Sequence, residues 1–351
     1  MVAPELADGY VATEIPEIRE VDDAFIAALH AFRCAIHAER RPAEPYKPLD
    51  ELTNDIRRLP SELENRTVVV RNSRGELVAV GDGGVERTGD NEHLYWADID
   101  VLPDDRRLGL GRWLLGWAAE ASNAAGCAVL STWSTSAVPS GEVFARLNEL
   151  EAKQVNRESE LDLTKIDWDM VDRWVEEGPG RAPGYELVLV EGVYPEDHYD
   201  NVIAWWNIMN TAPRDDLSWN DDHLTHQRLA EWEAKFALSA VDRWEFIARH
   251  NGTGDCVGVS NVWLAPWNPA VINQGDTGVH PDHRGHALGK WLKATMLQKI
   301  RNERPEACVV RTENAYSNDA MLGINNLLGF AESRADTIWE IPVEKALKLL
   351  N

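Results

Sequence analysis

The sequence predicts an α/β (α+β) protein built from two copies of one domain. The first observation is an ungapped repeat, in which residues 98–115 align with residues 276–293 at a constant offset of 178 residues. Nine of the 18 aligned pairs are identical. An offset this large indicates a duplicated domain, because solenoid units recur about every 20 to 50 residues. The second observation is that the predicted strands and helices follow the same order in both halves.

The first half is predicted to run strand, helix, helix, three strands, helix, strand, helix, strand. Apolar residues at helical spacing predict the first helix from Phe25 to Ile36, and residues 72–75 form a hairpin-type turn between two strands. The predicted strands lie at residues 9–14, 67–71, 76–85, 93–101, 127–132 and 154–163, and the other helices at 49–59, 110–124 and 142–150.

The second half repeats this order. Its predicted strands lie at residues 185–191, 244–249, 256–264, 272–279, 308–312 and 337–342, and its helices at 201–209, 224–236, 290–301 and 319–328. Between the copies, residues 167–174 have a helical pattern and residues 177–184 are rich in Gly and Pro, which indicates a linker. We therefore expect an N-terminal domain at residues 1–176, a linker at 177–184 and a C-terminal domain at 185–351.

Composition narrows the class of partner. The chain has 35 Lys and Arg against 59 Asp and Glu, a net charge of −24. Such an acidic surface disfavours nucleic acids and anionic membranes as partners and favours a cationic small molecule, although it also serves solubility. The four cysteines are scattered, so we expect no metal site and a reducing cytoplasm. Neither a signal peptide nor an apolar stretch of about 18 residues is found, which predicts a cytoplasmic protein. A homodimer is among the oligomeric states that the sequence leaves open.

The repeated segment carries the chemistry. In each copy a strand ends in Val-x-Pro-Asp-x-Arg and leads through a turn of small residues into an amphipathic helix. The first turn of a helix offers free N–H groups and the positive end of its dipole, and glycine lets a ligand approach the backbone, so such a turn suits a diphosphate. The spacing excludes the G-x-G-x-x-G and G-x-x-x-x-G-K-[ST] nucleotide motifs. Local positive charge comes from Arg106, Arg107 and Arg112 in one copy and from Arg284, His286 and Lys290 in the other.

The remaining pattern, Arg-x-x-Gly/Ala-x-Gly after a strand with Val-x-Pro, resembles motif A of the GCN5-related N-acetyltransferase (GNAT) family. The resemblance covers nearly the whole chain, whose organisation is similar to that of two-domain members such as mycothiol synthase. It implies that each domain is a mixed, mostly antiparallel sheet flanked by helices, and that acetyl-CoA is the acyl donor. The coenzyme-binding residues it implies are Val279, Arg284, Gly285, His286, Ala287, Leu288, Gly289 and Lys290, and in the first copy Val101, Arg106, Arg107, Leu108, Gly109, Leu110, Gly111 and Arg112.

A second stretch, residues 318–330, is similar to the later family motif N-x-x-A-x-x-L-Y-x-x-L-G-F. The resemblance implies that Asn318 lines the pantetheine channel, and we also expect a coenzyme contact from Asn314. The tyrosine of the family, its usual general acid, falls at Asn325, so Tyr316 becomes the substitute candidate. The first copy lacks Leu-Gly-Phe in this region, and we therefore expect the second domain to be the working enzyme.

A general base must take a proton from the acceptor amine, because an ammonium group has no lone pair with which to attack a thioester. Family members often carry this base six residues before the motif A valine, where this chain has Tyr95 and Asn273. The nearest carboxylates are Asp98 and Asp276, and Asp276 is the candidate base. Strand alternation points it to the opposite face, so a structural carboxylate that caps a turn is one alternative and deprotonation through water is another.

Together these features predict an acetyl-CoA-dependent N-acetyltransferase that acts on the primary amine of a small molecule by direct attack. Aromatic and acidic residues between Trp205 and Asp222 would suit a cationic acceptor. An amino sugar, an aminoglycoside-like metabolite, a polyamine and a peptide N-terminus all remain open as acceptors. Two alternatives are a CoA-binding sensor or scaffold without turnover, and an acyltransferase for a different acyl-CoA.

Overall fold

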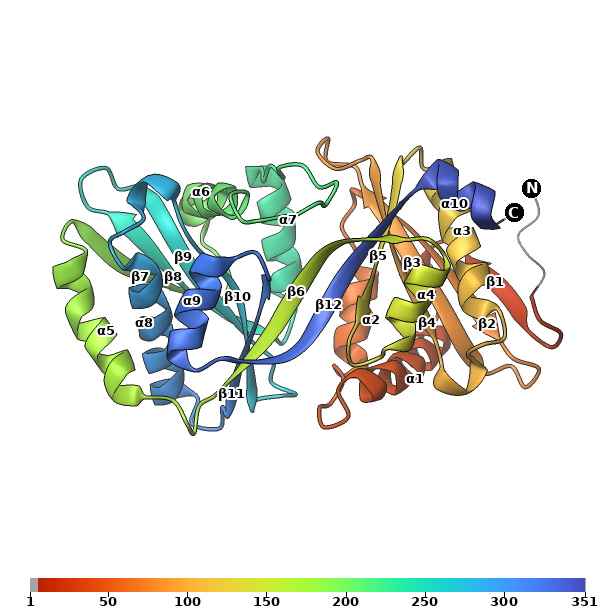
Figure 1. Cartoon of the computed structure of the whole chain (residues 1–351), viewed down its shortest axis with the longest axis horizontal. Coiled ribbons are helices and arrows are strands. Elements are labelled where there is room, and N and C mark those ends of the chain that lie inside the picture. The colour runs from red at the N-terminus through yellow and green to blue at the C-terminus, as the bar shows by residue number, and fades with distance from the viewer. Residues whose placement is uncertain (1–5, 351) are drawn as a thin grey trace. The chain divides into compact units, whose positions relative to one another are not determined.

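The computed structural model describes residues 6–350, except for the side chain of Leu350, and the chain divides into two compact units (Figure 1). The first unit holds the described residues up to Val155, Asp215–Asn220, and the described residues from Ala335 onward. The second unit holds Asn156–Arg214 and Asp221–Arg334. Neither unit is continuous in sequence. Among the described helices, none is both long and apolar enough to cross a lipid bilayer.

The first unit is built on a mixed sheet with the strand order β1-β2-β3-β4-β5-β12. Neighbouring strands are antiparallel except β4 and β5, which run parallel. The strands are β1 (Val11–Ile15), β2 (Leu63–Arg71), β3 (Leu77–Glu86), β4 (Leu94–Val101), β5 (Val129–Thr135) and β12 (Ala331–Pro342).

The second unit repeats this arrangement, with the order β7-β8-β9-β10-β11-β6 and one parallel pair, β10 and β11. Its strands are β7 (Tyr185–Glu191), β8 (Asp242–His250), β9 (Cys256–Leu264), β10 (Val271–Val279), β11 (Val309–Ala315) and β6 (Glu151–Asp162). The first residues of β6, 151–155, belong to the first unit, and those of β12, 331–334, belong to the second. The predicted fold class, two domains with mixed and mostly antiparallel sheets, is confirmed.

Each sheet is completed by a strand from the other half of the sequence. The strand β6 ends the first copy but pairs with β11, and β12 ends the second copy but pairs with β5. The helix that comes next in the sequence packs in the same unit as the exchanged strand. After β6, α5 (Trp168–Arg181) packs on α8 (Leu288–Glu303), and after β12, α10 (Val343–Leu350) packs on α3 (Leu110–Ala124). The boundaries drawn at residues 176 and 185 therefore describe the sequence repeats and not the compact units.

The expected linker begins inside a helix. Residues 177–181 form the last turn of α5, although they include Gly178 and Pro179. Gly178 packs so closely on α8 that a Cβ there would lie 2.5 Å from the ring of Trp291. Tertiary packing thus outweighs the local preference of Gly and Pro for a loop. The terminal helix α10 was also not predicted from the sequence.

Helices cover both faces of each sheet. In the first unit Val69 packs with residues of α1 (Asp23–Arg40) and α2 (Leu49–Arg57), while Val68 and Val70 pack with α3, as strand alternation requires. The remaining helices are α4 (Ser140–Leu147), α6 (Tyr199–Met209), α7 (His226–Phe236) and α9 (Asp319–Leu328).

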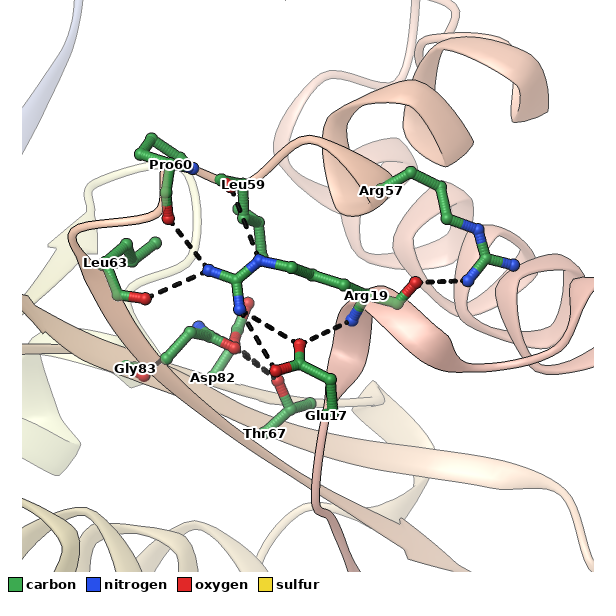
Figure 2. A network of polar contacts seen from close by, with 10 residues as sticks. Glu17, Arg19, Arg57, Leu59, Pro60, Leu63, Thr67, Asp82 and Gly83 are labelled. Atoms are coloured by element: carbon green, nitrogen blue, oxygen red, sulfur yellow. Dashed lines mark hydrogen bonds and ion pairs between the residues drawn. The ribbon is translucent and has the colours of Figure 1, made fainter. Parts of the chain in front are cut away.

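A half-buried arginine, Arg19, anchors the start of the first unit. Figure 2 shows Arg19, which follows β1, donating hydrogen bonds to the carboxylate of Glu17 and to main-chain carbonyls of the loop after α2. The distances to the carbonyls of Pro60 and Leu63 are 2.9 and 3.2 Å. These bonds tie the loop after α2 and the first residue of β2 to the segment that follows β1.

Candidate active site

The two copies of the repeated segment form the same turn from a strand into a helix. In the first unit the turn joins β4 to α3, and in the second unit it joins β10 to α8. We call residues 106–112 the first elbow and residues 284–290 the second elbow. In the second elbow, helical hydrogen bonding begins with the N–H of Trp291, which donates to the carbonyl of Ala287. The N–H groups of residues 288–290 precede it and are therefore free for an anion.

Two residues with positive φ shape each elbow. They are Gly285 (φ 86°) and Ala287 (φ 60°) in the second elbow, and Arg107 (φ 66°) and Gly109 (φ 85°) in the first. The left-handed conformation is unfavourable for residues other than glycine. Each elbow therefore has glycine at one of the two positions and a strained residue at the other, and the backbone path is the same.

The arginine that opens each elbow is anchored in the same way but is paired differently. The Nε of both Arg106 and Arg284 donates to the carbonyl of the last residue of the preceding strand, 3.0 Å away. The terminal nitrogens of Arg106 also bind both carboxylate oxygens of Glu39, at 2.7 and 2.5 Å. Arg284 instead donates to the hydroxyl of Thr211 at 3.3 Å. Within residues 6–350 the side chain of Arg284 bonds to a carbonyl and a hydroxyl and not to a carboxylate, so no acidic side chain offsets its positive charge.

A cavity of about 690 Å³ opens at the second elbow. Its walls come from α5, from the end of α6, from the end of β10, from the elbow itself and from the start of α9. Neither His286 nor Asn314 lines it, although both were predicted to bind the coenzyme. The predicted residues that do line the cavity are Val279, Arg284, Gly285, Ala287, Leu288, Gly289, Lys290 and Asn318.

The strands β10 and β11 separate beside this cavity. They pair only along Val271–Asn273 of β10, and β10 shifts its register against β9 between Gln274 and Thr277. Residues 277–279 lie beyond this point and line the cavity. A strand edge without a partner can hold an extended chain that contains amide groups through main-chain hydrogen bonds.

Helix α5 supplies a wall of the cavity that the sequence analysis missed. Trp174, Gly178 and Arg181 line it, and the ammonium group of Lys290 lies 5.0 Å from the centre of the Trp174 ring. These residues come from the helical segment between the copies and from the expected linker. No local signal could identify them, because α5 reaches α8 only through the exchange of β6.

Asp276, the predicted base, is half-buried on β10 next to Asn261 of β9. Burial raises the pKa of Asp276, and a hydrogen bond from Asn261 partly offsets this increase. Asn261 also donates to Glu245 at 3.4 Å, and the Tyr194 hydroxyl donates to the same Glu245 oxygen at 2.5 Å. Burial raises the pKa of Glu245 to about 7. Asp276 itself does not line the cavity, whereas its neighbour Thr277 does.

The candidates for the acid step lie away from the cavity or lack an acidic proton. Asn325, at the position of the family tyrosine, is 1% exposed and donates to Asn314 at 2.8 Å, which ties α9 to β11. Tyr316 is 41% exposed and does not line the cavity. Its hydroxyl donates to Glu332 at 2.5 Å, and this bond raises the pKa of Tyr316.

The first elbow is already occupied by contacts of its own chain. Arg106 is paired with Glu39, and Arg112 donates to the carbonyl of Leu349 in α10 at 2.9 Å. The side chain of Leu110 is 1% exposed, in the core. This elbow contains the remaining predicted residues Arg106, Arg107, Leu108, Gly109, Leu110, Gly111 and Arg112, on the same backbone path as the second elbow, and Val101 lies before it at the end of β4.

Comparison with known proteins agrees with the family resemblance of the sequence. Residues 28–147 match the model of a family described as the acetyltransferase (GNAT) family. No curated protein was found to match the chain. The similarity to mycothiol synthase stays a prediction.

Solved structures share the fold along nearly the whole chain. A tandem GNAT protein from the clavulanic acid biosynthesis pathway, solved without AcCoA, is 23% identical with a TM-score of 0.74, over 95% of this chain and 99% of that one. A GCN5-related N-acetyltransferase from Sphaerobacter thermophilus is 15% identical with a TM-score of 0.65, over 97% of both chains. The glucosamine N-acetyltransferase region of a fungal multi-domain GH3 β-N-acetylglucosaminidase is 11% identical with a TM-score of 0.62, over 97% of this chain and 38% of that one.

Proposed function

We propose that this chain is an acetyl-CoA-dependent N-acetyltransferase of the tandem GNAT type. The support is that residues 28–147 match the acetyltransferase (GNAT) family model and that a tandem GNAT protein shares the fold along nearly the whole chain. The acceptor is the primary amine of a small molecule, and the second unit is the catalytic one. The observation that carries the proposal is the second-unit cavity, which joins an unpaired strand edge to an elbow whose arginine is free of carboxylates.

The parts of the cavity fit the parts of the coenzyme. The free N–H groups of residues 288–290, together with Arg284, would hold the diphosphate. The edge of residues 277–279 would pair with the amides of the pantetheine arm, with Asn318 on the opposite wall. The first elbow fits less well, because the carboxylate of Glu39 already neutralises Arg106 and would repel a diphosphate.

The acceptor amine would attack the thioester carbonyl directly. Its nitrogen forms the new C–N bond, and the C–S bond breaks with its electron pair on sulfur. The amine proton passes through water to the carboxylate of Asp276, because Asp276 does not itself line the cavity. The raised pKa of Asp276 supports this role, because a base works best when its pKa approaches the working pH. The carboxylates of Asp276 and Glu245 also favour a cationic acceptor over an anionic one.

Calorimetry with acetyl-CoA, followed by a thiol-release assay across polyamines, amino sugars and aminoglycosides, tests the proposal. We expect one molecule of acetyl-CoA to bind per chain and at least one amine to give thiol release. Binding without release on any amine contradicts the enzyme. Binding that survives Arg284→Ala but is lost in Arg106→Ala contradicts the assignment to the second unit.

Two alternatives have specific support. A CoA-binding sensor is favoured by Asn325 and by the Tyr316 hydroxyl bound to Glu332, which leave the acid step without the family tyrosine. A longer acyl donor is compatible with the cavity volume of about 690 Å³. Thiol release from acetyl-, propionyl-, succinyl- and palmitoyl-CoA with one active amine separates the donors, and acetyl-CoA is expected to give the highest kcat/KM.

A further inference from the structure

A chain of hydrogen bonds runs from the centre of α8 to the cavity in the second unit. The Nζ of Lys293 donates to the Oε1 of Gln274 at 2.7 Å, and the Nε2 of Gln274 donates to the hydroxyl of Ser260 at 3.1 Å. The hydroxyls of Ser260 and Thr277 lie 3.0 Å apart, and Thr277 lines the cavity. The four side chains come from α8, β9 and β10, so only the tertiary structure brings them together.

Lys293 is an unusual residue for this position. It is 1% exposed, and its hydrogen-bond partner is an uncharged amide. Burial lowers the pKa of Lys293 to about 7, since a charged amine is poorly solvated there. A buried amine costs free energy that an apolar side chain of similar length would not cost. Its presence therefore needs a reason other than stability.

The donors and acceptors of these side chains allow the hydrogen bonds to run in one direction, from Lys293 to Thr277. The amine of Lys293 carries N–H groups in either protonation state, so it donates to the Oε1 of Gln274. This bond fixes the Gln274 amide with its NH₂ group toward the hydroxyls. Ser260 accepts from that NH₂ group and is fully buried, so its proton is directed to the oxygen of Thr277. Thr277 also lies 3.5 Å from the same NH₂ group. Its oxygen is then saturated as an acceptor, and its own proton is available to the cavity.

The first unit shows that the fold does not require this chain. Strand pairing places Gly81 where the second unit has Ser260, and Ile99 where it has Thr277. The repeat offset places Leu115 at the position of Lys293. The same sheet and helix therefore form without the two hydroxyls and the amine. This chain of hydrogen bonds is present in the second unit, which has the charged elbow and the cavity. It is missing from the first unit, where Glu39 is paired with the arginine of the elbow.

We propose that the Thr277 hydroxyl is a hydrogen-bond donor to the reacting thioester, and that Lys293, Gln274 and Ser260 are positioning residues that aim it. This inference rests on the proposed function. During transfer, negative charge gathers on the thioester while the C–N bond forms and the C–S bond breaks. The Thr277 hydroxyl keeps its proton and stabilises that charge, and the amine proton goes to Asp276. Such a donor would compensate for the absent tyrosine at Asn325.

Steady-state kinetics and acetyl-CoA calorimetry of Thr277→Val and Thr277→Ser test the donor. Thr277→Val, which keeps the shape of the side chain, should lower kcat by about 10- to 100-fold and change the Kd of acetyl-CoA by less than about threefold. Thr277→Ser should restore most of kcat. Thr295→Val is the matched control, because the Thr295 hydroxyl is buried on α8 without a hydrogen-bond partner, and its kcat should match the wild type. Wild-type kcat in Thr277→Val overturns the proposal.

A double-mutant cycle with Lys293→Met tests the positioning. Lys293→Met should lower kcat in the wild-type background and have no further effect in the Thr277→Val background, because both changes act through one hydroxyl. An equal loss in both backgrounds overturns the positioning role. Thr277→Val and Thr277→Ser decide the proposal if Lys293→Met does not fold. A wild type that binds acetyl-CoA but releases no thiol contradicts the proposed function instead, so the two failures are distinct.

Discussion

Arg106 and Glu39 form a two-point ion pair in the first elbow, with N–O distances of 2.7 and 2.5 Å. The corresponding arginine of the second elbow, Arg284, faces the hydroxyl of Thr211. The two elbows thus share a backbone and an anchored arginine, and they differ in net charge at the point where an anion would bind. The difference comes from one carboxylate of α1, Glu39, which pairs with Arg106 and has no counterpart at Arg284 among the described residues.

The first prediction concerns this charge. Arg284→Ala should raise the Kd of acetyl-CoA by about 10- to 100-fold, because a charge-assisted hydrogen bond to a phosphate contributes about 1.5 to 3 kcal/mol. Arg106→Ala is the matched control and should leave the Kd within about twofold. Isothermal titration calorimetry at fixed salt measures both. The reverse pattern would place the coenzyme in the first unit.

The second prediction concerns Asp276. Asp276→Asn should lower kcat by about 100-fold, because a general base contributes about 10² to 10⁴ to the rate. The carboxyl must be ionised to accept a proton, and its pKa is raised above the usual 3.8 by burial. The wild-type rate should therefore rise with pH through a pKa above that value, and the variant should lose this limb. A pH profile of kcat/KM checks it, and an unchanged profile would leave Asp276 with a purely structural role.

The third prediction concerns Tyr316, the candidate acid. Tyr316→Phe should keep kcat within about twofold of the wild type, since its hydroxyl is bound to Glu332 and lies on an exposed side chain. Thiol-release kinetics with the best amine measure the effect. A loss as large as that expected for Thr277→Val would instead make Tyr316 the acid.

The fourth prediction concerns backbone strain. Ala287 has φ 60°, in the left-handed region, where glycine is unstrained. Ala287→Gly should raise the free energy of unfolding by about 0.5 kcal/mol, the relief of strain being partly offset by the greater freedom of the unfolded chain. Gly109→Ala, at the equivalent position, should lower it by a similar amount. Paired urea unfolding curves measure both, and changes of the same sign would contradict the strain argument.

The fifth prediction concerns Glu245, whose pKa is raised by burial from 4.5 to about 7. Between these two values the folded state holds a proton that the unfolded state releases, so this carboxyl makes the folded state less stable as pH rises. Glu245→Gln carries no such proton. Relative to the wild type, the variant should therefore gain stability from pH 5 to pH 8, as measured by chemical unfolding at both values. A constant difference would show that Glu245 titrates normally.

Much of the site was predictable because its signal is local. The elbow depends on glycines, an arginine and a helix start within a few residues of one another, so the repeat at 98–115 and 276–293 exposes it directly. The family motifs also identified Val279 and Asn318, and both residues line the cavity. His286 and Asn314 were misplaced relative to the cavity, because a motif gives positions along the chain and not the direction in which each side chain points.

The sequence by itself determined that two copies of one fold are present, where most of their strands and helices lie, and which two turns share a glycine and arginine pattern between a strand and a helix. Periodicity, glycine and proline encode these features over short distances. Only the tertiary structure decided that β6 and β12 are exchanged, that α5 walls the cavity, that Glu39 closes the first elbow, and that Lys293 is linked to Thr277. Each of these depends on contacts between residues far apart in the chain, which neither periodicity nor a local motif records.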